Sequence, residues 1–249
     1  MPTLEVPLDS VEGAVLAAPF AERLELCDDL SSEGWTPTMS LIRAVRERID
    51  PSRTTIVSMI RPRSANNSAH LDVAAFTTTP RILDDCLHEI EASAKAGADS
   101  VAIGLLTADG HVDVDACAKM RDVARELGLI VAFLRTFDLL ADRTRGMHDI
   151  TALGITRVVT AGVLGWDASV LTLPQRLEVL AADARTAAAA ALVHGVVPVD
   201  VVPGGGVRAA NAGDFLTVSP HLHASCRRDG RVSLVELEQL SEVLASSRH

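Results

Sequence analysis

The chain has 249 residues, of which 48% are apolar and 22% are charged, a composition typical of a soluble globular protein. Its formal net charge of −10 disfavours nucleic-acid or anionic-membrane partners, because both need clustered positive charge. Aromatic residues make up only 3%, so stacking platforms for bases are poorly supplied as well. No apolar run approaches the roughly 18 residues of a membrane span. We therefore expect a soluble protein with no nucleic-acid and no membrane partner.

The cysteines and the first residues indicate a cytoplasmic protein. The four cysteines, at positions 27, 86, 117 and 226, form no CxxC pair, and in a chain of this length they are typical of reduced thiols. The first eighteen residues carry Glu5, Asp9 and Glu12 and no basic residue, which is unlike a signal peptide.

Short β-rich runs alternate with helical stretches along the whole chain. Eight strands are expected, at residues 3–6, 23–27, 54–60, 100–105, 130–135, 155–160, 196–202 and 221–224. Helices are expected at residues 11–18, 79–97, 113–127, 173–192 and 233–245. Pro80 is suited to a first helical turn, and Gly97 and Gly128 are suited to helix ends.

Strands that alternate with helices predict a parallel sheet with right-handed crossovers. Eight such units in a chain of this length predict the fold class α/β and, within it, a single (β/α)₈ TIM-type barrel over residues 1–249. No linker rich in Pro, Gly or Ser divides the chain. The longest irregular stretch, residues 62–78, is long enough to be a lid or an oligomer contact.

In such barrels the functional site lies at the carboxyl ends of the strands. Period-two alternation predicts that Leu24 and Leu26 face the helices, so Glu25 and Cys27 face the barrel. The same reasoning at the other strands and just beyond them yields the candidate catalytic set Glu5, Glu25, Arg61, Arg63, Arg135, Asp138, His223 and Ser225. Two interpretations stay open. The charges form a structural ion-pair network, or the carboxylates are acid–base groups beside an arginine clamp for an anion.

Gly204, Gly205 and Gly206 follow the seventh strand and precede a helix. Glycines here allow backbone N–H groups to converge on an anion, so a phosphate or carboxylate site is expected. The alternative is a tight turn that needs positive φ. Either way, the partner that these residues predict is a small anionic ligand.

Metal binding and Schiff-base chemistry depend on particular residues. His223 and Cys27 are candidate metal ligands, although a neutral hydrogen-bonded histidine is the ordinary alternative. A Schiff-base aldolase needs a buried lysine on a strand, and both lysines, Lys95 and Lys119, lie in predicted helices.

The sequence resembles the CutC copper-homeostasis family. The resemblance is carried in chain order by Arg23-Leu24-Glu25-Leu26-Cys27, Gly34-Trp35-Thr36-Pro37-Thr38, Met59-Ile60-Arg61-Pro62-Arg63, Phe133-Leu134-Arg135-Thr136-Phe137-Asp138 and Pro203-Gly204-Gly205-Gly206-Val207. It covers most of the chain. It implies a TIM-type barrel, a cytoplasmic location, a homo-oligomer (dimer or tetramer) and a role in copper homeostasis through Cu(I) binding.

The chain departs from the family pattern at a proposed ligand. Of the two family cysteines, the second matches Cys27, but the first falls on Pro7, which cannot bind a metal. The resemblance therefore implies copper held by Cys27 with His223 assisting. Cu(I) is soft and prefers thiolates, whereas the retained carboxylates and guanidiniums suit a small anionic molecule better.

Two functions follow as hypotheses. One is a CutC-like protein of copper homeostasis. The other is a barrel enzyme, a lyase or isomerase, that acts on a small phosphorylated or carboxylated metabolite by proton abstraction or by aldol chemistry without a Schiff base. A non-catalytic sensor or scaffold is a third hypothesis.

Overall fold

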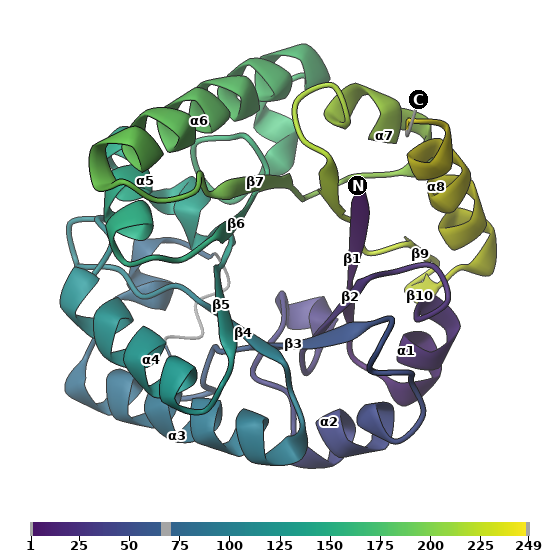
Figure 1. Ribbon diagram of the computed structural model, residues 1–249, viewed down its shortest axis with the longest axis horizontal. Helices are drawn as coiled ribbons and strands as arrows, with labels where there is room; N and C mark the ends of the chain where they lie inside the picture. Colours follow the sequence, from purple (N-terminus) through teal and green to yellow (C-terminus); the bar gives the residue numbers. More distant parts are fainter. Residues whose placement is uncertain (1, 66–70, 248–249) are drawn as a thin grey trace.

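Eight parallel strands form a barrel surrounded by helices in the computed structural model, which describes residues 2–65 and 71–247 (Figure 1). The strands are β1 (Thr3–Leu8), β2 (Arg23–Leu26), β3 (Thr55–Met59), β4 (Ser100–Ile103), β5 (Ile130–Phe133), β6 (Arg157–Thr160), β7 (Asp200–Pro203) and β8 (His221–His223). The predicted (β/α)₈ barrel is therefore confirmed.

Sequence neighbours pair in order from β1 to β7, and β8 returns to pair with β1. Figure 1 shows this return, in which the purple first strand lies beside a yellow-green segment from the last part of the chain. Within the described residues no ladder joins β7 to β8. The two strands are nevertheless close, because a Cβ built on Gly204 would lie 3.5 Å from His223 Cδ2. The His223 side chain therefore lies against the backbone that follows β7 at this seam.

The helices form the outer layer and begin at well-capped residues. They are α1 (Val11–Ala17), α2 (Met39–Arg46), α3 (Pro80–Ala96), α4 (Val114–Glu126), α5 (Arg143–Ala152), α6 (Leu173–His194), α7 (Ala209–Phe215) and α8 (Leu234–Ser246). In α3 the Thr79 side chain accepts from the Ile82 N–H, and Gly97 ends the helix with φ of 100°. The boundaries predicted for this helix are confirmed.

The largest error in a predicted strand boundary concerns the seventh strand, and two helices were not predicted. The seventh strand begins at Asp200 and not at 196, because α6 continues to His194 and ends at Gly195. The sequence patterns also missed α2 and α5, two short helices. Their caps are ordinary: Thr38 and Asp142 each accept a hydrogen bond from a backbone N–H in the first turn.

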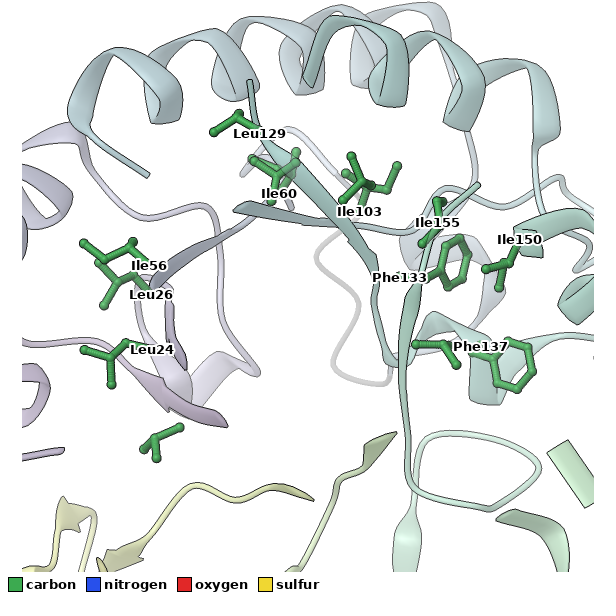
Figure 2. Packing of buried hydrophobic residues seen from close by; sticks show 14 of the residues in the cluster. Leu24, Leu26, Ile56, Ile60, Ile103, Leu129, Phe133, Phe137, Ile150 and Ile155 are labelled. Atoms are coloured by element: carbon green, nitrogen blue, oxygen red, sulfur yellow. The ribbon is translucent and has the colours of Figure 1, made fainter. Parts of the chain in front are cut away.

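The main core lies between the strands and the helices. Leu24, Leu26 and Ile56 point outward into this layer, as Figure 2 shows, and all three are fully buried. Phe133 and Ile150 fill the same layer on the other side of the barrel. The predicted outward face of the second strand is confirmed, and its alternate residues are left for the interior.

The interior of the barrel is divided into an apolar and a charged part. Strands β3 to β5 contribute a small apolar cluster of Val57, Ala102, Ala132 and Leu134, with Met59 against it. The other strands contribute the buried charged residues Glu5, Glu25 and Arg157 and, partly buried, Arg23 and His223. Within the described strands, the interior charges therefore come from β1, β2, β6 and β8.

Loops at the carboxyl ends of the strands carry short elements that shape the mouth. They are the 3₁₀ turns η1 (Leu30–Ser32), η2 (Val73–Phe76), η3 (Arg135–Leu139) and η4 (Ala168–Val170), and the hairpin β9 (Arg227–Arg228) with β10 (Arg231–Val232). The stretch 62–78, predicted as a lid or an oligomer contact, contains η2, and its residues 66–70 lie outside the described residues. None of the helices in the described parts of the chain is long and apolar enough to cross a membrane.

Candidate functional site

A cavity of about 670 Å³ opens at the carboxyl ends of the strands. Seven of the predicted residues line it: Glu25, Arg61, Arg135, Gly205, Gly206, His223 and Ser225. The remaining predicted residues, namely Glu5, Cys27, Arg63, Asp138 and Gly204, do not. The residues that sequence reasoning missed include Phe76, Trp166 and Arg208, which lie on loops far apart in the chain.

His223 lies between two buried carboxylates. Its Nδ1 is 2.8 Å from Glu5 Oε1, and its Nε2 is 3.8 Å from Glu25 Oε2. Neighbouring strands produce this arrangement, because β1 places Glu5 beside both His223 of β8 and Arg23 of β2. Glu25 lies one inward position further along β2 and reaches the cavity, whereas Glu5 lies below it.

The two carboxylates differ in their expected charge. Burial alone would raise the pKa of Glu5, but Arg157, His223 and Arg23 outweigh it and hold the pKa well below its usual range. Arg23 Nε donates to Glu5 at 2.6 Å. For Glu25, burial is the largest cause and the negative charge of Glu5 adds to it, so its pKa rises to about 7 despite the opposing charge of His223. One carboxyl therefore stays ionised while the other titrates near neutrality.

The imidazole of His223 is suited to proton transfer. Burial lowers its pKa, but the hydrogen bond to Glu5 and the charges of Glu25 and Glu5 outweigh burial, so the net direction is upward. Because an ionised carboxylate only accepts hydrogen bonds, Nδ1 must carry a proton towards Glu5. Nε2 is then the nitrogen that exchanges protons with Glu25 or with a bound molecule.

Arg61 follows β3 and is only 4% exposed, although it lines the cavity. Its Nη1 donates to the carbonyls of Ser32 and Gly34, and its guanidinium stacks over Trp35 at 4.0 Å. Its Nε is buried without a hydrogen-bond partner in the described structure. Burial lowers the pKa of this guanidinium.

Arg63 corrects an expectation. The alternation predicts that it shares the inward face of Arg61, but its side chain is 61% exposed and pairs with Asp28 outside the cavity. The physical reason is that β3 ends at Met59, so the period-two alternation of the strand does not continue through Pro62.

Asp138 is fully buried and does not line the cavity; its carboxylate is hydrogen-bonded to neighbouring residues. It accepts hydrogen bonds from Arg135 Nε at 3.2 Å, Arg143 Nη1 at 3.2 Å, Thr160 Oγ1 at 2.5 Å and the Ala161 N–H at 2.8 Å. These partners occupy both of its oxygens. Asp138 therefore orients Arg135, which lines the cavity and also donates to the carbonyl of Trp166.

The conformation of the glycine loop is held by positive φ angles and by hydrogen bonds to its carbonyls. Gly205 and Gly206 have φ of 65° and 80°, which favours glycine. The carbonyls of Gly204 and Gly205 both accept from Arg176 Nη2, at 2.8 and 2.7 Å. Among the described hydrogen bonds, none is donated by the N–H groups of Gly205 and Gly206, which remain available to an anion.

Arg176 is the positioning residue that sequence reasoning missed. It lies on the buried face of α6, and its Nε donates to the carbonyl of Ala161 at 2.7 Å, so it ties the β6 and β7 loops together. A signal was present: Arg176, Leu180 and Asp183 recur at spacings of four and three, which placed two charged residues on an inward helix face.

Cys27 follows β2 as predicted, but it is fully buried and does not line the cavity. Its thiol donates to the Leu8 carbonyl at 3.5 Å, and burial raises its pKa. Cu(I) prefers thiolate ligands, and Pro7 stands where a second thiol is implied. In the described parts of the chain no three His, Cys, Asp or Glu residues are grouped to hold a metal ion. The residues present therefore do not fit a Cu(I) site of Cys27 with His223.

The fold defines a TIM-type barrel with a cavity at the carboxyl ends of its strands. The model of the CutC family matches residues 3–227 of this chain, so the chain belongs to the CutC family. A copper homeostasis protein cutC homolog from Homo sapiens is 34% identical over 160 residues, which cover 64% of this chain and 54% of the human protein. A CutC family protein from Xanthomonas campestris pv. campestris (strain B100) is 34% identical over 228 residues, covering 90% of this chain and 83% of the relative.

A solved structure of CutC from Streptococcus agalactiae shares the fold. It superposes with a TM-score of 0.75 at 21% identity, covering 94% of this chain and all of that chain. The family resemblance read from the motifs is therefore confirmed. The cytoplasmic location and the homo-oligomer stay predictions.

Proposed function

We propose that this barrel binds a small anionic organic metabolite and transfers a proton on it, with His223 and Glu25 as the acid–base pair. The observation that carries the proposal is the position of His223 between the two carboxylates. Glu5 orients the ring from below the cavity, and Glu25 faces Nε2 within the cavity. A group with a pKa of about 7 is well matched to proton transfer at neutral pH.

Acidic residues, namely Asp9, Asp29 and Glu33, line part of the cavity, and its arginines and loop amides support an anion as the bound group. Arg135 and Arg208 line the cavity beside the unpartnered amides of Gly205 and Gly206. Guanidiniums and converging amides bind phosphate or carboxylate and stabilise negative charge that develops in a reaction. Proton abstraction next to a carbonyl, as in an isomerase or a lyase, is the reaction class that uses both parts.

Solvent deuterium exchange tests the acid–base role even when the product is unidentified. A panel of phosphorylated and carboxylated metabolites is first screened for stabilisation of the wild-type protein, and the hits are incubated in D₂O and followed by NMR. We expect C–H exchange in the wild type and its loss in Glu25→Gln and His223→Asn, with binding retained. Glu126→Gln, at the exposed end of α4, is the matched control. Exchange that survives in Glu25→Gln and His223→Asn would contradict the proposal.

Copper handling is the second candidate, and the naming of the relatives favours it: two of them are named copper homeostasis proteins. An anaerobic Cu(I) competition titration with a colorimetric chelator tests it on wild type, Cys27→Ser and Cys117→Ser. A copper role for Cys27 predicts tight one-to-one binding that only Cys27→Ser abolishes. Because the Cys27 thiol is buried and hydrogen-bonded, we expect no difference among the three proteins.

A further inference from the structure

One wall of the cavity is a stack of two arginines and two aromatic rings. The Arg61 guanidinium lies 5.3 Å from the centre of the Phe76 ring, which stacks on the Trp166 ring at 5.7 Å and 25°. The Arg135 guanidinium in turn lies 4.5 Å from the centre of the Trp166 ring. All four residues line the cavity. The two cations are therefore held apart by a pair of stacked rings.

At the first end, Glu33 acts on the charge of Arg61 without forming an ion pair with it. Within residues 2–65 and 71–247 Arg61 forms no ion pair, and its Nε is buried without a partner. Only its Nη1 is used, for the two loop carbonyls. A buried guanidinium is costly unless an anion pairs with it, and the open side of this one faces the cavity.

At the second end, several donors converge. The Gly205 backbone lies against Arg135, because a Cβ built there would be 3.4 Å from its Cζ. The Nε1 of Trp166 is buried and has no hydrogen-bond partner in the described structure. Arg208, which donates to Ser225 Oγ at 3.1 Å, lines the cavity with the unpartnered amides of Gly205 and Gly206. Of these groups, Arg208 and the two glycine amides line the cavity and are suited to bind an anion.

We propose that the cavity takes a metabolite with two anionic groups, one bound at Arg61 and the other at Arg135, Arg208 and the Gly205–Gly206 amides. The inference rests on the proposed function and adds the second anion to it. Phe76 and Trp166 separate the two subsites and cover each other's faces, so the carbon skeleton between the anionic groups packs against the edges of the two rings. A phosphorylated carboxylic acid and a bisphosphate both have this chemistry.

Calorimetric titration with two series of probes tests the proposal. One series is α,ω-alkanediol bisphosphates from ethylene to hexamethylene, and the other is the monoalkyl phosphates of matched length. We expect one chain length at which the bisphosphate binds at least tenfold more tightly than its monophosphate. Equal affinities at every length would overturn the two-subsite proposal, since a second phosphate would then find no partner.

Variants show which subsite provides the higher affinity of the bisphosphate. Arg61→Gln is expected to remove the advantage of the bisphosphate over the monophosphate of matched length. Arg63→Gln, whose side chain is exposed outside the cavity, is the matched control and should leave this advantage unchanged. If Arg61→Gln does not fold, Arg61→Lys is used, which keeps the charge but loses the stacked fork, and a reduced gain is expected. An advantage that survives intact in the folded variant contradicts the role of Arg61.

The two proposals fail in different ways. Monophosphate binding that Arg208→Gln weakens, without any further gain from a second phosphate, refutes only the dianionic ligand. Absence of binding for every phosphate probe refutes the dianionic ligand and also the anion subsite of the proposed function. Loss of deuterium exchange in Glu25→Gln is measured separately and reports on proton transfer alone.

Discussion

His223 donates from Nδ1 to Glu5 across a distance of 2.8 Å, and this pair determines which nitrogen of the ring is left for chemistry. Glu5 accepts this hydrogen bond as a carboxylate, because Arg23 and Arg157 keep it ionised although it is buried. A carboxylate behind an imidazole fixes the tautomer and the orientation of the ring. The candidate acid–base pair therefore depends on a residue that does not line the cavity.

Glu5→Gln is expected to lower the pKa of His223 and to destabilise the fold. The pKa falls because the ring loses both a charged hydrogen-bond acceptor and a nearby negative charge. Removing one partner of a buried ion pair costs about 3–5 kcal/mol, here because Arg23 and Arg157 lose their shared counter-charge. NMR titration of the His223 ring and chemical denaturation measure the two effects. Glu12→Gln, on an exposed side chain of α1, is the control and should change neither.

Glu25→Gln is expected to change the pH dependence of stability. Between the pKa of an unfolded glutamate and the folded value of about 7, the folded protein holds a proton that the unfolded chain has lost. The free energy of unfolding therefore falls as pH rises through this window, and Gln, which does not titrate, removes that fall. We expect the melting temperature of the variant, relative to that of the wild type, to rise between pH 5 and pH 8. Parallel profiles would show that Glu25 titrates normally.

Arg176→Lys is expected to weaken phosphate binding about tenfold or more while the barrel stays folded. A lysine keeps the charge, but its single ammonium cannot hold the carbonyls of Ala161, Gly204 and Gly205 together, so the loop amides lose their fixed direction. Calorimetric titration with a monoalkyl phosphate measures the loss. Arg185→Lys, exposed on the same helix, is the control, and an equal affinity in both variants would refute the positioning role.

Two glycine substitutions are expected to act in opposite directions. Gly205→Ala should destabilise by about 1–2 kcal/mol, because its φ is 65° and the new methyl meets Ala161 Cβ at 3.0 Å. Gly213→Ala should stabilise by about 0.5–1 kcal/mol, because this glycine is inside α7 with open space around it. Chemical denaturation measures both. A stable Gly205→Ala variant would mean that the loop does not need its left-handed turn.

The sequence alone determined the barrel and much of its interior. Alternation of apolar residues within a strand depends only on local geometry. It therefore predicted correctly that Leu24 faces the helices and Glu25 faces the interior, without knowledge of the other segments. The same local reasoning placed Glu5 and His223 in the interior, where β1 and β8 pair. The sequence also indicated the tight glycine turn after the seventh strand, because a positive φ is a requirement of the local backbone.

Only the tertiary structure decided which of these groups meet. Alternation stops where a strand stops, so it misplaced Arg63, and it could not show that the Cys27 thiol is enclosed. Phe76 and Trp166 come from loops that are distant in sequence, and nothing in their own segments indicates that they share one wall of the cavity. Hydrophobic periodicity depends on neighbours a few residues away, whereas a cavity depends on contacts between strand ends that only the closed barrel brings together.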